Sequence, residues 1–293
     1  MAAVEPVVDE PAAVADLGAE RALLVADVHA GIEVGLRYER GVELESRADE
    51  RVDRLCSLID ATGVDRLVVL GDLAHRIGAP EGEEREELAR LVSAVTDRVP
   101  LTLVEGNHDA GVAAAFADDI DVIAPEGGLL REDGTSREGD GRTADASGLG
   151  VLHGHTRPDP ALRSADVVCM GHEHPQVRLE DAVGGSRTER AWLRGPLNPS
   201  VFDAEDHRDD GEREPDESER EPDDSEGEPD DGEGGPAGSG PELVVFPAFN
   251  ERSGGTWINV EGGSFLAPFL PDGLVAGDAY LLDGTRLGDF RRI

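Results

Sequence analysis

Short apolar runs that lead into polar side chains recur five times in the first 175 residues of the chain. The runs cover residues 23–26, 67–70, 101–104, 150–152 and 167–170, and each is followed by Asp, Asn or His, directly or after an intervening glycine or Glu-Gly pair. Such runs are typical of buried strands. Open α/β sheets bind their ligands at the carboxyl ends of strands. If the five strands lie side by side in one sheet, we expect their polar residues to share one pocket.

Longer stretches with helical periodicity separate the early runs. Residues 46–62 and 81–97 carry apolar residues at helical spacing and predict helices that cover the sheet. The alanine-rich residues 111–117 predict a short helix, with the carboxylate of Asp109 as its N-terminal cap. The glycine-punctuated stretch 31–41 predicts a loop beside the strand ends.

Strand-like patterns dominate the two ends of the chain. Residues 4–17, broken by prolines, predict edge strands, and alternating segments after residue 175 predict four further strands at 176–179, 191–194, 243–246 and 279–282. A second sheet packed on the first would bury the later strands. The predicted fold class is therefore α/β (α+β), a two-sheet β-sandwich flanked by helices.

Two polar segments interrupt this pattern. Residues 203–241 consist almost entirely of Asp, Glu, Gly, Pro and Ser, and residues 131–147 are polar and glycine-rich. The first has too few apolar side chains to fold and is predicted to be disordered, and the second predicts a hairpin tip. We favour a solvated acidic insertion over an acidic partner-binding segment. We therefore predict a single domain over residues 1–293, interrupted by a disordered acidic insertion at about 203–241.

The charge balance is strongly acidic, with 64 acidic and 27 basic residues and a formal net charge of −37. Every basic residue is arginine, and the absence of lysine excludes a P-loop nucleotide site and Schiff-base chemistry. Such a charge would repel nucleic acid in dilute buffer. A salt-rich cytosol mutes that repulsion, so we favour a halophilic source and do not exclude DNA or RNA as a substrate.

The cysteines and the N-terminus carry little chemistry. Cys56 and Cys169 fall in apolar stretches and are interpreted as core residues rather than a disulfide or a zinc ribbon. The chain shows neither a signal-peptide pattern nor an apolar run long enough to span a bilayer. We expect a cytoplasmic protein without a membrane partner.

The polar residues at the strand ends form a mixed set of nitrogen and oxygen donors. Its seven members are Asp27, His29, Asp72, Asn107, His153, His172 and His174. Such a set suits divalent first-row metals and exceeds what one four-coordinate ion needs, so two ions are predicted. Pairs of ions clamp the attacking and leaving oxygens of phosphate esters. Each histidine taken singly could be an ordinary hydrogen-bonded residue, but five coincidences in order argue against that.

These residues also resemble a known family. The order and contents of five blocks between about residues 20 and 175 are similar to the signature of the calcineurin-like metallophosphoesterases: Asp27-x-His29, Gly71-Asp72, Gly106-Asn107-His108-Asp109, His153 and Gly171-His172-x-His174. Three later stretches resemble the archaeal ICC-like branch related to the nuclease subunit of double-strand-break repair: residues 171–175, 247–250 and 282–288.

The resemblance implies two metal sites that share Asp72. The first would be held by Asp27, His29, Asp72 and His174, and the second by Asp72, Asn107, His153 and His172. Manganese is favoured, with zinc, iron, nickel or cobalt as alternatives. Glu173 lies between two of these ligands and is interpreted as solvent-exposed, with a supporting contact to a ligand as the alternative.

Two further histidines are candidates for proton transfer. In the repair-nuclease relatives, the positions that match His75 and His108 form a pair. A metal-free imidazole near the leaving oxygen can protonate it, and a second imidazole can orient the first, which are the roles expected for His108 and His75. Many phosphatases of the superfamily carry Asp at the position of His75, so this residue favours a nuclease or phosphodiesterase. The alternative is an ordinary loop histidine.

Three residues are candidates for substrate contact. Arg37 in the stretch 31–41 and Arg157 after the fourth apolar run could hold a phosphate, although solvent-exposed charges explain them as well. His155 follows His153 by two residues and would face the substrate or support a ligand.

The predicted activity is that of a dinuclear metal-dependent phosphoesterase. Its substrate is predicted to be a phosphodiester, either nucleic acid or a small nucleotide-like molecule. The alternatives are a phosphomonoesterase of a small metabolite, a non-catalytic metal-bound scaffold for a repair protein or nucleic acid, and a protein with one structural zinc. The sequence indicates no specific protein partner.

Overall fold

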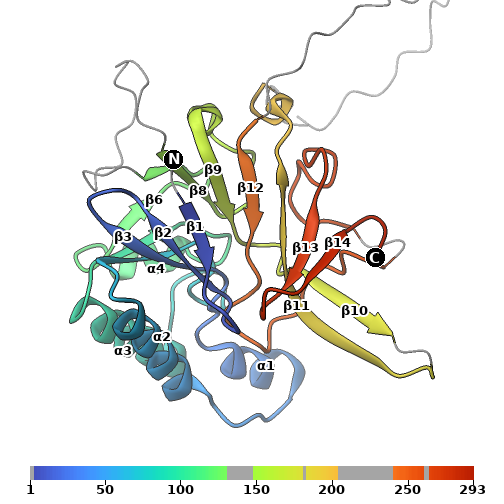
Figure 1. Cartoon of the computed structure of the whole chain (residues 1–293). Helices are drawn as coiled ribbons and strands as arrows, with labels where there is room; N and C mark the ends of the chain where they lie inside the picture. Colours follow the sequence, from blue (N-terminus) through green and yellow to red (C-terminus); the bar gives the residue numbers. More distant parts are fainter. Residues whose placement is uncertain (1–2, 131–147, 181–182, 204–239, 261–263) are drawn as a thin grey trace, which may run out of the picture.

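The computed structural model describes residues 3–130, 148–180, 183–203, 240–260 and 264–293 (Figure 1). The predicted hairpin tip at 131–147 and nearly all of the predicted acidic insertion at 203–241 lie outside these residues. The single-domain prediction therefore stays a prediction.

The first sheet has six strands in the order β1-β2-β3-β4-β5-β6. Their bounds are Ala3–Pro6, Ala12–Asp16, Arg21–Val25, Arg66–Val69, Leu101–Val104 and Asp121–Ile123. The strands β1 and β2 pair antiparallel at one edge, as predicted for residues 4–17, and β3 to β6 run parallel. The parallel part therefore has all its carboxyl ends on one side.

The second sheet has eight strands in the order β14-β13-β11-β12-β9-β8-β7, and β10 pairs with β11. From β7 to β14 the bounds are Gly128–Leu130, Gly148–Leu152, Ala165–Met170, Gln176–Glu180, Ser186–Pro196, Glu242–Val245, Asp278–Leu281 and Arg286–Asp289. The strands β8, β9 and β12 are parallel neighbours, and the remaining pairs are antiparallel. The four late strands predicted from alternation are confirmed.

The five ligand-bearing strands do not all lie in one sheet. The strands β3, β4 and β5 lie in the first sheet, whereas β8 and β9 lie in the second. Like β3 to β5, the strands β8 and β9 are largely buried on both faces and have a layer on each side. Their inward side chains pack face to face with those of the first sheet, as Val151 and Cys169 do in one cluster with Leu24. The polar residues after all five strands still meet at one rim.

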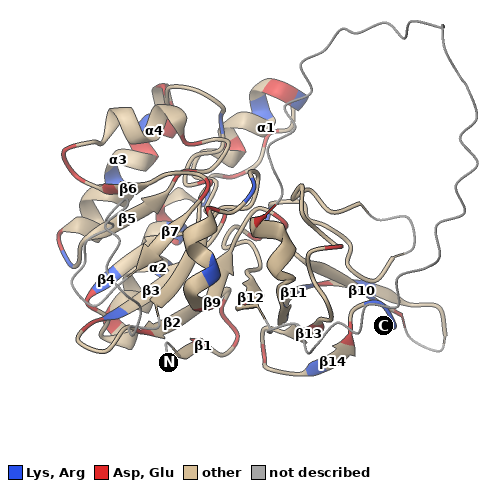
Figure 2. Ribbon diagram, turned by 90° about the horizontal axis from the view of Figure 1, so that it is seen from above, with Lys and Arg blue, Asp and Glu red and all other residues tan. Residues whose placement is uncertain are grey.

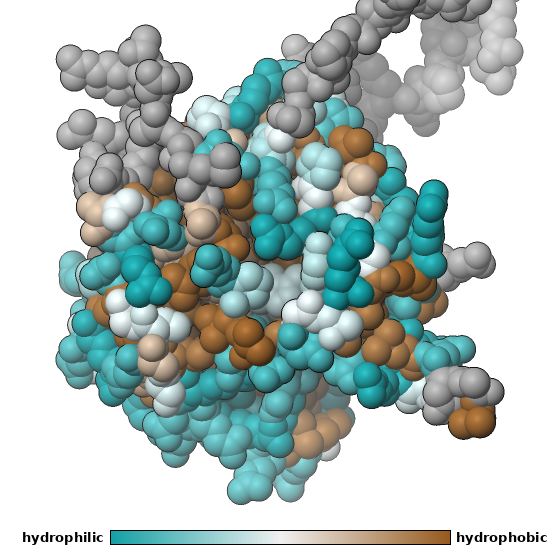
Figure 3. All heavy atoms as spheres, viewed as in Figure 1, coloured by the Kyte–Doolittle hydropathy of each residue, from teal (hydrophilic) through white to brown (hydrophobic). Residues whose placement is uncertain are grey.

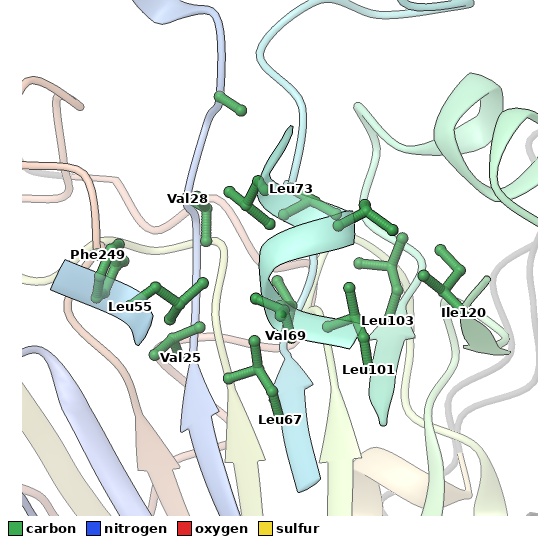
Figure 4. Close-up of a cluster of buried hydrophobic side chains, with 14 of the residues drawn as sticks. Val25, Val28, Leu55, Leu67, Val69, Leu73, Leu101, Leu103, Ile120 and Phe249 are labelled. Atoms are coloured by element: carbon green, nitrogen blue, oxygen red, sulfur yellow. The ribbon is translucent and has the colours of Figure 1, made fainter. Parts of the chain in front are cut away.

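Alternation along the strands sorts the side chains into layers. In β3, Leu23 and Val25 face a cluster that includes Leu55 of the helix α2 (Ala48–Thr62), whereas Leu24 faces the second sheet. Figure 4 shows the helix-side cluster, with Leu55 beside Val25 and the leucines of β4 and β5 on the same side of the strands. A third cluster covers the outer face of the second sheet and includes Val168 and Leu243.

Four α-helices belong to the first half of the described chain (Figure 1). They are α1 Ile32–Arg40, α2 Ala48–Thr62, α3 Gly82–Thr96 and α4 Ala110–Ala115. The three predicted helices are confirmed within about two residues at each end, but the prediction of a loop over 31–41 is wrong. Gly31 and Gly41 adopt left-handed φ angles of 85° and 64° at the two ends of α1, so these glycines bound a helix rather than interrupt one.

The order of layers is helices, first sheet, second sheet and an irregular outer layer. The outer layer contains the short 3₁₀ helices η1 Pro160–Ser164 and η2 Pro199–Phe202 and residues near 265–274. Strands in the middle are largely free of charge, whereas charged residues gather on helices and loops (Figure 2). Hydrophobic residues on the face in Figure 3 form small groups among hydrophilic ones. Among the described residues, no helix combines the length and apolarity of a membrane span.

Candidate metal centre

The structure brings the predicted metal ligands together where β3, β4, β5, β8 and β9 end. Three groups of side chains have donor atoms within 4.8 Å of one another: Asp27 with His29 and His174, His29 with Asp72 and His108, and Asp72 with His153 and His172. The groups share members, so they form one continuous centre. Asn107 joins it, since its Oδ1 lies 3.2 Å from His153 Nε2.

Left-handed backbone marks the same residues. Among the described residues, six other than glycine have positive φ, and five of them are predicted ligands: Asp27 (56°), His29 (44°), Asp72 (52°), His172 (68°) and His174 (46°). The sixth is Asp9. This conformation is unfavourable for a residue with a side chain and persists where the surroundings enforce it, which is typical of functional sites. The turns after the strands are therefore shaped to aim these side chains at one another.

The first group is arranged around the fully buried Asp27. One carboxylate oxygen, Oδ1, lies 3.1 Å from His174 Nε2, and the carboxylate also accepts the backbone N–H of His172. His174 Nδ1 donates to the carbonyl of Gly254 at 2.6 Å, which directs its Nε2 toward the centre. His29 is buried, and its Nδ1 has no hydrogen-bond partner among the described residues.

Asp72 stands between this group and the group that contains His153 and His172. Its Oδ1 lies 3.5 Å from His153 Nε2, and its Oδ2 lies 3.8 Å from His29 Nε2 and 3.8 Å from His108 Nε2. His153 is fully buried, and its Nδ1 donates to the carbonyl of Leu70 at 2.8 Å, so its Nε2 is the atom left for a metal. One carboxylate therefore faces both sides of the centre.

Burial and charge set the protonation of the ligands in the metal-free protein. Burial lowers the pKa of His29 to about 4, and burial together with the charge of His153 lowers the pKa of His172 to about 4. Both imidazoles are neutral at pH 7. Burial also acts against protonation of His153, but the hydrogen bond and charge of Asp72 outweigh it and raise the pKa of His153 to about 9. That proton has to leave before the ring can bind a metal.

His108 lies at the edge of the centre and contacts His75 through the backbone. Its Nδ1 is in close contact with the carbonyl oxygen of His75, and its own N–H donates to Asp72 Oδ1 at 3.1 Å. The two rings stack with centroids 6.0 Å apart. The His75 ring packs against Gly35 of α1, where an added Cβ would lie 2.3 Å from His75 Cδ2. The two predicted proton-transfer residues are thus adjacent, and a carbonyl joins them.

The prediction that Asp109 caps the following helix is wrong, because α4 has no side-chain cap. The carboxylate points back into the molecule instead and accepts the backbone N–H groups of Leu73, Ala74 and Gly106 at 2.9 to 3.2 Å. Asp109 is fully buried, and burial with the charge of Asp72 raises its pKa to about 7. It ties the loop after β4 to the loop after β5.

The predicted substrate contacts lie in different surroundings. His155 is close to the centre, with its ring centroid 5.2 Å from that of His153 and 6.0 Å from that of His172. Arg37 pairs with Glu83 of α3 at 3.2 Å, so its guanidinium already has a carboxylate partner. Arg157 is exposed. Of the three, His155 is the one that the structure places beside the predicted ligands.

The structure assigns supporting roles to Asn250 and Glu173 that differ from the interpretation of these residues in the sequence. Asn250 is buried, and its Nδ2 donates to the carbonyls of Val28 at 2.9 Å and His29 at 3.3 Å. Its stretch 247–250 stood out only as a family-like motif. Glu173 is fully buried rather than solvent-exposed, because it accepts hydrogen bonds from Thr256, Leu266 and Ala267. It holds the segment that follows Gly254, the partner of His174.

A comparison with protein families decides the family. The sequence model of the calcineurin-like phosphoesterases matches residues 20–176, more than half of the 293 residues and the whole stretch that carries the predicted ligands. The chain belongs to the calcineurin-like phosphoesterases. As a member of this family it is a metal-dependent hydrolase. A search of curated proteins found no significant match.

Solved structures with similar folds include three bacterial proteins. Nuclease MPE from Pseudomonas putida is 17% identical with a TM-score of 0.46, over 97% of this chain and 100% of that one. The phosphoesterase YfcE from E. coli is 21% identical with a TM-score of 0.32, over 55% and 74%. A predicted phosphoesterase from Streptococcus pneumoniae is 14% identical with a TM-score of 0.23, over 56% and 67%.

The residues at the rim fit divalent metal ions. Imidazole nitrogens and carboxylate oxygens are the donors that borderline first-row metals prefer. The Nδ1 of His29 is a buried nitrogen that has no hydrogen-bond partner among the described residues. The backbone carbonyls of Leu70 and Gly254 fix the far nitrogens of His153 and His174, as supporting contacts of metal-bound histidines do.

Proposed function

We propose that this phosphoesterase uses two divalent metal ions, with manganese favoured, to hydrolyse phosphodiesters. The first ion would be held by Asp27, His29, Asp72 and His174, and the second by Asp72, Asn107, His153 and His172. The single observation that carries the proposal is the position of Asp72, whose two oxygens face different groups of ligands. Two-metal enzymes in general hold their ions roughly 3.5–4 Å apart, and a carboxylate shared by both ions suits that spacing.

When bound, such ions supply a nucleophile from water at neutral pH and neutralise charge on the phosphate. The chain's own residues provide the proton for the leaving oxygen. His108 is not needed as a ligand, and its Nε2 faces Asp72 while its Nδ1 contacts the His75 carbonyl. In this proposal His108 donates its Nε2 proton to the leaving oxygen.

The choice of a diester rests on His75. Its ring lies beside that of His108, and by the family resemblance His75 stands where many phosphatases of the superfamily carry Asp, so it favours a nuclease or phosphodiesterase. Burial and the charge of His108 lower the pKa of His75, so the ring is neutral at pH 7. We propose nucleic acid or a small nucleotide-like diester as the substrate, with His155 as a contact. Arg37 and Arg157 would contribute through surface charge.

The test compares methyl phenyl phosphate, a diester, with phenyl phosphate, the matching monoester. Hydrolysis is measured in high salt with manganese or with a chelator, for the wild type, His108→Ala and the surface control Asn259→Ala. We expect manganese-dependent cleavage of the diester that falls about 10²–10⁴-fold in His108→Ala, because the phenolate leaves poorly without a proton. An unchanged rate in His108→Ala, or a preference for the monoester, would contradict the proposal.

A further inference from the structure

A buried carboxylate on α3 holds the loop that carries His75. Glu84 lies in the first turn of α3 and has no exposed surface. Its Oε1 accepts the backbone N–H of His75 at 3.1 Å and that of Arg76 at 2.8 Å. The N–H of His75 also donates to the carbonyl of Ala30 at 3.0 Å. The backbone that follows the bridging Asp72 is therefore tied to a helix and to the loop after β3.

The space around Glu84 is built to receive it. Its Cγ lies 2.5 Å from where a Cβ would stand on Gly31, and Gly31 has a φ of 85°. One turn further along α3, Glu87 accepts the N–H of Gly31 at 3.0 Å and is itself paired with Arg51. Burying a carboxylate is costly unless it is hydrogen-bonded, and only Oε1 of Glu84 has hydrogen-bond partners among the described residues, so an acidic residue at this place indicates a demand for that one acceptor oxygen.

The hydrogen bonds of Glu84 act on His108 through one peptide group. Glu84 accepts the N–H of Arg76, and this N–H belongs to the same peptide group as the His75 carbonyl, which contacts His108 Nδ1. A carbonyl oxygen can only accept, so His108 carries a proton on Nδ1. Its Nε2, 3.8 Å from Asp72 Oδ2, is then the nitrogen that faces the reaction. The His75 carbonyl also stabilises the ring when Nε2 is protonated as well.

We propose that Glu84 is a positioning residue for the leaving-group step, and that it acts by holding the His75 carbonyl against His108. This inference rests on the proposed function, in which His108 protonates the leaving oxygen. It assigns the orienting role to the backbone of His75 and to a helix residue outside the metal-binding motifs.

A structural role alone would have a different signature. If Glu84 only stabilised the fold or the metal ligands, its loss would slow all substrates by the same factor. A positioning role for the proton donor predicts a loss that grows as the leaving group becomes poorer. Methyl 4-nitrophenyl phosphate releases a phenolate that needs little protonation, whereas methyl phenyl phosphate releases one that needs it.

The experiment compares Glu84→Ala and Glu84→Gln with the control Glu86→Gln, on an exposed carboxylate of the same helix. We expect Glu84→Ala to slow the phenyl ester about 10- to 100-fold more than the nitrophenyl ester, the effect of a small misplacement of the donor. Glu84→Gln keeps an acceptor oxygen and should restore the wild-type ratio within about threefold, since one neutral acceptor still meets both N–H groups. Glu86→Gln should match the wild type.

Two further readouts remove ambiguity. Bound metal per chain should be unchanged in Glu84→Ala, and ¹⁵N spectra of metal-free protein with labelled histidine should show His108 protonated on Nδ1 in the wild type but mixed in Glu84→Ala. An equal loss on both esters, or an unchanged His108 spectrum, would overturn the inference. If His108→Ala itself shows no leaving-group dependence, the proposed function fails first, and the inference fails with it.

Discussion

The two sheets contribute to the metal centre in different ways. The first sheet supplies both carboxylates and the amide, from Asp27, Asp72 and Asn107, together with His29. The second sheet supplies imidazoles alone, from His153, His172 and His174. The negative charge that would balance two cations therefore lies on one side of the sandwich, and neutral nitrogen donors close the centre from the other.

The supports of the ligands also cross between the sheets. His153 follows β8 in the second sheet, but its Nδ1 donates to Leu70 at the end of β4 in the first. The backbone N–H of His172 likewise donates to Asp27 of the first sheet. Hydrogen bonds that support the ligands therefore run between the two sheets as well as within each of them. The geometry of the centre therefore depends on how the two sheets pack, and metal binding should stabilise the sandwich as a whole.

The strongest test of this division removes one imidazole from each group. His174→Ala removes a second-sheet ligand from the group around Asp27. His172→Ala removes one from the group that contains His153. We expect each variant to bind one metal instead of two and to lose about 10²–10³-fold in activity, the scale for losing a group that stabilises transition-state charge. Metal analysis after dialysis and diester hydrolysis measure the two effects. Retention of both metals in either variant would contradict the assignment.

A weaker perturbation removes the hydrogen bonds that Asn250 donates to the loop after β3. Asn250→Asp replaces a donor to the Val28 and His29 carbonyls with a carboxylate that repels them. We expect about a 10- to 100-fold loss of metal affinity, typical of a broken supporting contact, with the fold retained. Asn259→Asp is the matched control, since Asn259 also bonds backbone groups but lies at the exposed edge of β10. Equal affinities in the two variants would show that Asn250 does not support the ligands.

A small change on α1 tests the environment of His75. Gly35→Ala places a Cβ 2.3 Å from the His75 ring, which has to move. Gly148→Ala at the start of β8 is the control, because the added Cβ would meet only ordinary contacts of 3.5 Å or more. We expect about a tenfold loss of diester hydrolysis for Gly35→Ala without loss of metal, because the ring beside the proton donor is displaced. Wild-type rates in Gly35→Ala would remove His75 from the mechanism.

The smallest expected effect is on the pH dependence of the metal-free protein. The pKa of His153 rises from its ordinary 6.5 to about 9 in the fold, through Asp72 against the effect of burial. A folded pKa above the unfolded one gives stability that is complete below pH 6.5 and is lost as pH rises through 9. Denaturant unfolding at pH 6.5 and 9 should show this decline in the wild type and a smaller one in Asp72→Asn. An equal loss of the free energy of unfolding between pH 6.5 and 9 in the wild type and in Asp72→Asn would contradict the pairing of His153 with Asp72.

The sequence predicted much of the centre because its ligands follow a local rule. Each of Asp27, Asp72, Asn107, His153 and His172 comes just after a short apolar run, and the ends of parallel strands meet by geometry. Which sheet each run joins is not local, since β8 and β9 are as apolar as β3 and β4. The distribution of the runs over two sheets therefore could not be predicted from the runs themselves, and it leaves the ligand set unchanged.

The residues that support the ligands could not be predicted either, because their contacts are also not local in the sequence. Glu84, Glu87 and Glu173 look like surface carboxylates in an acidic chain, and only the packing of α3 and the contacts of Thr256, Leu266 and Ala267 show that they are buried and bonded. Asp109 pointed to a helix cap because capping is a local pattern, whereas its true partners lie on another loop. Long-range hydrogen bonds leave no periodic trace in a sequence.

The central claim is that Asp72 is shared by two metal ions, one on each side of it. Native mass spectrometry of the wild type and of Asp72→Asn, each loaded with manganese and exchanged into volatile buffer, tests this most directly. We expect two ions per wild-type chain and the loss of both sites' occupancy in Asp72→Asn, since the carboxylate faces both groups. One ion per wild-type chain, or two ions retained in Asp72→Asn, would contradict the account.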